Sequence, residues 1–123
     1  MTSEISLVKG EGRTKICLLA RKIGRDLIIT ITGGREHAGA IGIGLFINDK
    51  ATSSVITLPN HREDAIAKQA AEEIAKELRT NTVVIAGIHL DNITREEIDE
   101  VVKNSKTLVA ELIAEFKRRE GGV

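Results

Sequence analysis

The first half of the chain alternates hydrophobic and polar positions with the period of two that is typical of β-strands. In the segment 26–32, for example, Leu27, Ile29 and Ile31 share one side, which would face a core. Turns rich in Gly, Asp and Asn separate the alternating segments. The pattern predicts five strands, over residues 4–9, 15–23, 26–32, 38–47 and 54–58.

The second half of the chain changes to the period of a helix. A helix is predicted over residues 61–79, because its apolar positions recur every four residues and form a narrow, alanine-rich stripe. Asn60 and Glu63 stand three residues apart at its start, as the two members of a capping box do. The recurring apolar positions are Ile66, Ala70, Ile74 and Leu78.

A short apolar run over residues 83–88 predicts a sixth strand, and a second capping box, Thr94 and Glu97, marks the start of a last helix. Taken together, the elements follow the order β-β-β-β-β-α-β-α. We therefore expect one α/β (α+β) domain over residues 1–123, with a largely antiparallel sheet of about six strands and two helices on one or both of its faces. The apolar stripe of the last helix comprises Ile98, Val101, Val102, Leu108, Val109, Leu112, Ile113 and Phe116.

Residues 33–44, with the sequence GGREHAGAIGIG, are rich in glycine but lack the common nucleotide-binding patterns. Ile47 stands where the dinucleotide fingerprint needs a glycine. Leu45 and Phe46 stand where a phosphate-binding loop needs Lys followed by Ser or Thr. A nucleotide enzyme of either type is therefore not indicated by this stretch.

The same stretch is better explained as a strand with one bare side. Its large residues, including Ile41 and Ile43, would build the core from one side, and Leu45 and Ile47 continue that side. A strand side without side-chain volume usually admits a close neighbour. Three neighbours remain open: a helix, for which residues 67–75 are the candidate, a second subunit, or a flat ligand. The bare side carries Ala38, Ala40, Gly42 and Gly44.

Composition narrows the classes of partner and the cellular location. Lys and Arg together number 18, as do Asp and Glu, and Trp and Tyr are absent, so we expect no nucleic-acid partner. A single cysteine, Cys17, excludes an internal disulfide and is expected in the core of a cytoplasmic protein. No apolar run approaches the roughly 20 residues of a membrane span, so no membrane association is expected. Many charged residues with few Cys, Met and Pro are thermophile-like.

The three histidines stand at three junctions between predicted elements. His37 precedes the bare strand, His61 begins the first helix, and His89 ends the sixth strand. Polar side chains at such junctions are often functional. Arg35 and Arg62 lie beside two of them and, with the amide groups of two helix N-termini, would suit an anionic ligand.

Other interpretations of these residues stay open. The three histidines could be ordinary loop residues that never meet, and Asp91 and Asn92 could serve only the turn before the last helix. A three-histidine metal site with Asp91 or Glu63 as a fourth ligand would suit a small metal- or histidine-dependent enzyme acting on an anionic substrate. A third interpretation is a homodimeric interaction module that pairs through the bare strand side. No nucleophile motif is present, so we assign no catalytic residue. No two histidines share a short metal-binding spacing such as H-x-x-x-H, so we assign no metal ligand.

Three segments resemble, in order and spacing, the motifs of the LpdD-like family of small decarboxylase accessory proteins. They are GGREHAGAIGIG, LPNHREDAIA and AGIHLDNITREEI, and the resemblance extends over residues 32–98. Asn60 stands where the family more often has glycine. The residues that match the three motifs are Gly33, Gly34, His37, Gly39 and Ala40, then His61, Arg62 and Glu63, then Gly87, His89, Asp91 and Asn92.

The resemblance implies a fold like that of proteasome-assembly chaperones, often as a homodimer. It also implies a chaperone that handles prenylated FMN, or FMN, for a UbiD-type decarboxylase and is not itself catalytic. The cofactor-binding residues expected on this basis, together with the neighbouring arginines, are Gly33, Gly34, Arg35, His37, Gly39, His61, Arg62, His89, Asp91 and Asn92.

Overall fold

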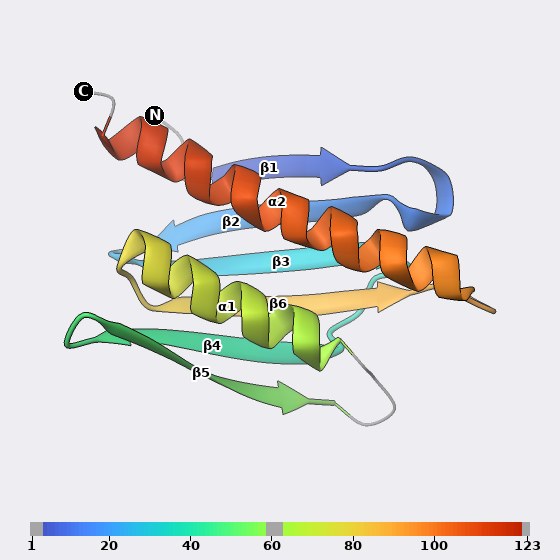
Figure 1. The fold of residues 1–123 in the computed structure, drawn as a ribbon, viewed down its shortest axis with the longest axis horizontal. Helices are drawn as coiled ribbons and strands as arrows, with labels where there is room; N and C mark the ends of the chain where they lie inside the picture. Colours follow the sequence, from blue (N-terminus) through green and yellow to red (C-terminus); the bar gives the residue numbers. More distant parts are fainter. Residues whose placement is uncertain (1–3, 59–62, 122–123) are drawn as a thin grey trace.

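The computed structural model describes residues 4–58 and 63–121, which form one six-stranded sheet with two helices on the same face (Figure 1). The predicted order of elements is confirmed. The elements are β1 (Glu4–Lys9), a short 3-10 turn η1 (Gly12–Thr14), β2 (Ile16–Ile23), β3 (Asp26–Gly34), β4 (Ala40–Ile47), β5 (Lys50–Thr57), α1 (Asp64–Leu78), β6 (Thr82–His89) and α2 (Arg95–Gly121).

The strands lie in the order β1-β2-β3-β6-β4-β5. All neighbours are antiparallel except β3 and β6, so the sheet is largely antiparallel, as predicted, with one parallel pair at its centre. Because β6 lies between β3 and β4, the chain must cross the end of β6 to pass from β3 to β4. The ends of β3 and β6 therefore lie at one edge of the sheet, where α1 and α2 both begin (Figure 1).

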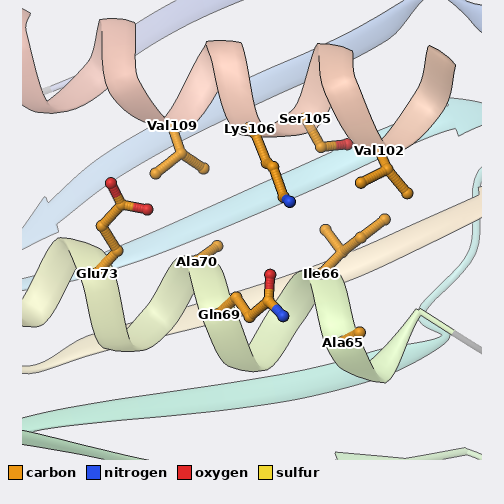
Figure 2. Close-up of a pocket in the computed structure, with 9 residues that line it drawn as sticks. All are labelled: Ala65, Ile66, Gln69, Ala70, Glu73, Val102, Ser105, Lys106 and Val109. Carbon is orange, nitrogen blue, oxygen red and sulfur yellow. The ribbon is translucent and has the colours of Figure 1, made fainter. Parts of the chain in front are cut away.

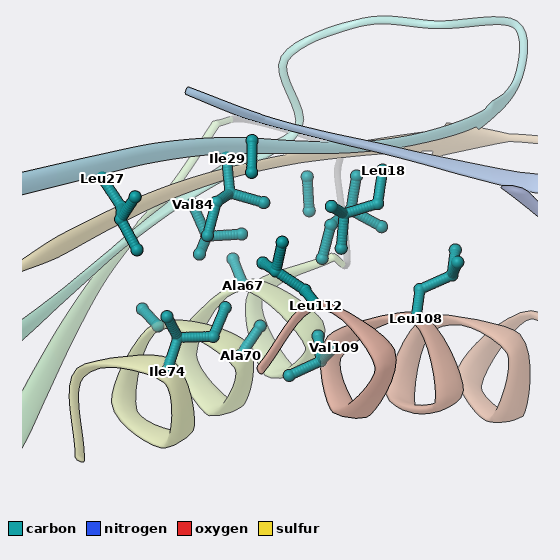
Figure 3. Packing of buried hydrophobic residues seen from close by; sticks show 14 of the residues in the cluster. Leu18, Leu27, Ile29, Ala67, Ala70, Ile74, Val84, Leu108, Val109 and Leu112 are labelled. Carbon is teal, nitrogen blue, oxygen red and sulfur yellow. The ribbon is translucent and has the colours of Figure 1, made fainter. Parts of the chain in front are cut away.

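The main core lies between the sheet and the two helices (Figure 3). Leu27, Ile29 and Ile31 of β3 are buried there, which confirms the side of β3 predicted to face a core. Most of the apolar stripe of α2 is buried as well, because the alternation of the strands and the helical period both turn apolar atoms toward this layer. The largest fully buried apolar side chains are Ile16, Leu18, Ile29, Ile31, Ile74, Leu108, Leu112 and Val84.

The bare side of β4 is covered by α1. A side chain on Gly42 would collide with the carbonyl group of Ala67, and one on Gly44 with the carbonyl group of Ala71. Of the three occupants left open by the sequence, the alanine-rich helix is the one found. A flat ligand or a second subunit on this side of β4 is excluded by the helix.

The expectation that the large residues of β4 build this core is wrong. Ile43, Leu45 and Ile47 lie on the opposite face of the sheet, with 36%, 37% and 58% of their surface exposed. The reason is steric, because a helix backbone can approach β4 closely only over positions that lack side-chain bulk. Cys17, expected in the core, also lies on this outward face and is half-buried.

The predicted start of α2 is confirmed in atomic detail. The Thr94 amide donates to Glu97 Oε1 at 3.0 Å, and the Glu97 amide donates to Thr94 Oγ1 at 3.1 Å, which is the reciprocal pattern of a capping box. The corresponding prediction for α1 depends on Asn60, which lies outside the described residues. None of the helices within residues 4–58 and 63–121 combines the length and apolar character that a membrane crossing requires.

Candidate functional site

The connection from β3 to β4 brings backbone close to the end of β6. The Arg35 amide donates to the His89 carbonyl at 2.9 Å, and the Gly39 amide donates to the Ala86 carbonyl at 2.9 Å. Between these two anchors the chain passes so close to β6 that a side chain on Gly87 would collide with the backbone of His37. Residues 35–39 are thus fixed by main-chain contacts on both sides.

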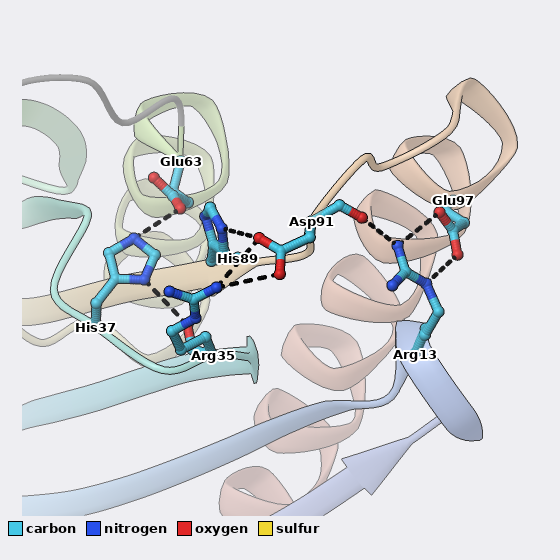
Figure 4. A network of polar contacts seen from close by, with 7 residues as sticks. All are labelled: Arg13, Arg35, His37, Glu63, His89, Asp91 and Glu97. Carbon is cyan, nitrogen blue, oxygen red and sulfur yellow. Dashed lines mark hydrogen bonds and ion pairs between the residues drawn. The ribbon is translucent and has the colours of Figure 1, made fainter.

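His37 lies at the middle of this connection, and both nitrogens of its ring face oxygen atoms. Nδ1 lies 3.1 Å from the carbonyl oxygen of Arg35, which can only accept, so Nδ1 carries a proton. Nε2 faces Glu63 Oε1 at 3.2 Å (Figure 4). The pair is an ion pair when both ring nitrogens of His37 are protonated, and in that state it ties the connection to the start of α1.

Glu63 joins three elements through one buried carboxylate. Only 8% of the residue is exposed. Its Oε1 accepts a hydrogen bond from the Ile88 amide at 3.2 Å. The carboxylate thus takes the place of a carbonyl group of a neighbouring strand at the end of β6. The carboxylate also lies against Gly39, where a side chain would collide with it. Glu63 therefore fixes α1 to the ends of β6 and β4, a role that its position in the sequence does not reveal.

Arg35 and His89 both turn toward one exposed carboxylate, Asp91. The Arg35 guanidinium donates to Asp91 Oδ1 and Oδ2, each at 3.1 Å, and His89 Nε2 lies 3.0 Å from Oδ1. The hydrogen bond from His89 and the positive charge of Arg35 lower the pKa of Asp91. We call Arg35, His37, Glu63, His89 and Asp91 the strand-end cluster.

Arg13, from the 3-10 turn η1, extends the strand-end cluster toward α2. Its guanidinium donates to Glu97 Oε2 at 2.8 Å and to the Asp91 carbonyl at 2.7 Å (Figure 4). The hydrogen bond from Arg13, followed by the Thr94 amide, lowers the pKa of Glu97 to about 2. Sequence reasoning missed Arg13, because no local motif connects residues that far apart in the chain.

The two helix N-termini at this edge differ in what they offer an anion. The start of α2 is closed by its own capping box, and acidic residues in the first turn balance the positive end of the helix dipole. At α1, Glu63 makes no capping hydrogen bond to the described residues of the helix. The positive end of α1 is therefore the less satisfied of the two within the described part of the chain.

The structure brings together four of the residues predicted from the sequence, Arg35, His37, His89 and Asp91. The rings of His37 and His89 lie 6.1 Å apart, so the interpretation in which the histidines never meet is wrong for these two. His61 and Arg62 lie outside the described residues.

The other predicted positions serve the backbone. Gly34 has a φ of 60°, and a side chain there would collide with the His89 carbonyl. Gly33 and Gly39 are buried. Asn92 has a φ of 53° in the turn before α2, which matches the turn role considered for it.

A metal ion finds no ready set of ligands in the described part of the chain. Within residues 4–58 and 63–121, no group of three or more His, Cys, Asp or Glu side chains is arranged to hold one. What the strand-end cluster offers chemically is a pair of hydrogen-bond donors, Arg35 and His89, that share one exposed carboxylate. Charged donors of this kind suit oxyanions, including carboxylates and phosphates.

The amino-acid sequence also matches a known protein family. The family model described as the prenylated flavin chaperone LpdD-like domain matches residues 10–117. The chain belongs to this family. The match includes every described residue of the strand-end cluster, and it makes this LpdD-like domain a member of a family of flavin chaperones.

One relative and one solved structure are also similar to this chain. Protein LpdD of Lactiplantibacillus plantarum is 26% identical over 103 residues, which cover 75% of this chain and 70% of that protein. The fold is similar to that of a chain in a chaperone complex for assembly of the yeast 20S proteasome, with a TM-score of 0.60. That likeness covers 94% of this LpdD-like domain and 97% of the other chain at 12% identity, so it concerns the fold alone. The expected proteasome-assembly-chaperone-like fold is confirmed.

Proposed function

We propose that this LpdD-like domain binds prenylated FMN, or FMN, by its phosphate at the strand-end cluster and passes it to a UbiD-type decarboxylase without catalysing a reaction. The observation that carries the proposal is the placement of two donors, Arg35 and His89, on a single exposed carboxylate, Asp91. Open sheets commonly bind ligands beyond the carboxyl ends of their parallel strands, and β3 and β6 end here.

In this proposal Asp91 occupies the place of the phosphate until the cofactor arrives. The side chains of Arg35 and Asp91 are 72% and 68% exposed. Replacing the Asp91 carboxylate by a phosphate on Arg35 therefore requires little desolvation. The start of α1 adds the positive end of a helix dipole. His61 and Arg62 precede Glu63 directly in the sequence and complete the proposed ligand set, with Gly33, Gly34, Gly39 and Asn92 shaping the backbone around it.

The test compares three variants of the proposed ligand set with one matched control. Arg35→Gln, His61→Ala and His89→Ala are expected to weaken binding of FMN and prenylated FMN about tenfold, the effect of losing one charge-assisted hydrogen bond. Binding is measured by quenching of flavin fluorescence, and transfer by the activity regained by a cofactor-free UbiD-type decarboxylase.

Arg25→Gln is the control for these variants. Arg25 lies in the turn between β2 and β3, at the end of β3 away from the cluster, and is exposed. It is expected to bind and transfer flavin as the unmodified protein does. If all three ligand-set variants bind and transfer flavin like the control, the phosphate is not bound at this edge of the sheet.

We further propose a homodimer, formed by the sheet face that the helices leave uncovered. The supporting observation is that the outward side chains of the central strands are mostly apolar, with Thr30 and Thr32 of β3 as the polar exceptions. One row across the sheet consists of Leu19, Thr30, Ile85, Ile41 and Ile56, each opposite the next. The solvent-exposed face of a sheet normally carries polar residues. The composition of this face is instead typical of a face that is covered by another protein surface.

A second copy of the chain suits this face because its centre carries no charged side chain. The uncharged outward positions lie within residues 28–32 of β3, 83–87 of β6 and 41–45 of β4. In a two-fold interface each patch meets itself, so any charge near the axis would face its own copy. An uncharged apolar face avoids that repulsion. The dimer proposed from the sequence used the bare side of β4, which α1 covers; the present proposal uses the other side.

Sedimentation equilibrium distinguishes the two faces of the fold. Ile43→Glu, on the uncovered face, is expected to give a monomer with an unchanged circular dichroism spectrum. Ile98→Glu is the control, since Ile98 is 45% exposed and belongs to α2, which lies on the other face of the sheet. A monomeric unmodified protein, or a dimer that survives Ile43→Glu and Leu19→Glu together, would count against the sheet-face interface.

A further inference from the structure

The groove between α1 and α2 is not used by the proposed flavin site or by the proposed dimer. It has a volume of about 380 Å³, within the range of roughly 300–1,000 Å³ typical of small-molecule sites. Figure 2 shows the groove between the two helices, on the side of the helical layer away from the sheet. Its apolar lining comes from both helices: Ala65, Ile66 and Ala70 from α1, and Val102 and Val109 from α2.

Ser105 places a buried hydroxyl group at this groove, and no described residue accepts a hydrogen bond from it. The residue is only 2% exposed, and its hydroxyl has no hydrogen-bond partner among the described residues. A serine inside a helix usually donates to a carbonyl of the preceding turn, and Ser105 does not. A buried hydroxyl without a partner is unfavourable, so an acceptor brought by a ligand would be held strongly.

Two further donors line the groove beside Ser105. The Lys106 ammonium group and the Gln69 side-chain amide both reach into the space between the helices (Figure 2). Within residues 4–58 and 63–121 neither has a side-chain partner. Glu73 lines the groove on the side of Val109, and its negative charge disfavours an anion there. The groove thus combines an apolar lining with hydrogen-bond donors near Ser105 and a carboxylate near Val109.

We propose that this groove binds a short amphiphile with an aliphatic body and an oxyanion head. The body lies against Ile66, Val102 and the smaller apolar residues, which lose contact with water when it binds. The head accepts hydrogen bonds from Lys106, Gln69 and Ser105, and Glu73 sets its position by repulsion. A carboxylate and a phosphate monoester share this head chemistry. The proposal does not depend on the flavin site, because it uses none of the strand-end cluster.

Titration of isotope-labelled protein, followed by amide chemical shifts, tests the groove directly. The probes are hexanoate, hexyl phosphate and, as an uncharged analogue of the same chain length, hexanol. Saturable shifts confined to α1 and α2 are expected with at least one anionic probe, and binding of hexanol is expected to be about tenfold weaker. The stronger of the two anions identifies the head as carboxylate or phosphate.

Variants separate specific binding from general attraction to a basic surface. Lys106→Gln and Ser105→Ala are expected to weaken binding of the anionic probe, Lys106→Gln by about tenfold. Lys103→Gln is the matched control, since Lys103 is exposed on α2 but does not line the groove, and it is expected to leave binding unchanged.

Three outcomes would overturn the proposal. The first is that neither anion saturates the groove, and the second is that Lys103→Gln weakens binding as much as Lys106→Gln does. The third is that the amide shifts of the groove respond only to an added decarboxylase, which would make the groove a protein-docking surface.

Discussion

His37 and His89 meet edge to face, with ring centroids 6.1 Å apart and ring planes at 76°. Each ring faces its own carboxylate, Glu63 at 3.2 Å and Asp91 at 3.0 Å. The two pairs differ in burial, because the Glu63 side chain is 9% exposed and the Asp91 side chain 68%. Breaking a buried pair leaves desolvated groups without partners, whereas an exposed pair is easily exchanged. The cluster therefore has a fixed half at Glu63 and an exchangeable half at Asp91.

Asp91→Asn is expected to strengthen the binding of FMN. The substitution removes the carboxylate that competes with the phosphate for Arg35 and His89, and asparagine still fits the turn. The dissociation constant for FMN, measured by fluorescence quenching at low salt, should fall severalfold relative to the unmodified protein. Asp26→Asn, at the opposite end of β3, serves as the control for the change in net charge. Equal or weaker binding in Asp91→Asn would show that Asp91 does not occupy the phosphate position.

Glu63→Ala is expected to lower the free energy of unfolding by about 1–3 kcal/mol, because it leaves the Ile88 amide without its acceptor and His37 without its carboxylate. Glu63→Gln should cost less, since its side-chain oxygen can still accept from Ile88. Urea denaturation measures both. Glu73→Ala, exposed on the same helix, is expected to stay within about 0.5 kcal/mol of the unmodified protein. A loss of similar size in Glu73→Ala would contradict the role given to Glu63.

Arg13→Gln is expected to change stability in a pH-dependent way. The hydrogen bond from Arg13 is the largest cause of the lowering of the Glu97 pKa from 4.5 to about 2. Because the folded-state value is the lower one, this stabilisation is present above pH 4.5 and is lost as the pH falls toward 2. The difference in urea midpoint between Arg13→Gln and the unmodified protein should therefore shrink over that range. Lys15→Gln, an exposed control, should show no such trend. A difference that stays constant with pH would mean that Glu97 does not carry it.

Gly42→Ala is expected to destabilise the fold by about 1–3 kcal/mol, because the added methyl group must displace α1 at Ala67. Thermal unfolding followed by circular dichroism measures the loss. Thr57→Ala, exposed at the end of the neighbouring strand, is expected to stay within about 0.5 kcal/mol. The dimer proposed for the opposite sheet face should survive Gly42→Ala. Dissociation without a loss of stability would contradict the sheet-face interface.

The sequence predicted the elements and their order well because those features depend on neighbours a few residues away. The alternation of Leu27, Ile29 and Ile31 placed a strand correctly, and the Thr94–Glu97 spacing placed the start of α2. The strand β5 was predicted too late, at residue 54 in place of Lys50. Its first four residues, Lys50 to Ser53, include no large apolar side chain, so the hydrophobic pattern does not mark them.

The sequence by itself determined two sides for β4 and three junctions that carry histidines. Only the tertiary structure decided which side of β4 is inside, because close approach of an alanine-rich helix outweighs the apolar area of Ile43 and Leu45. Only the insertion of β6 between β3 and β4 brought His37 to His89. The insertion pairs strands that lie far apart in the chain. Local hydrophobic patterns carry no information about which distant strands become neighbours.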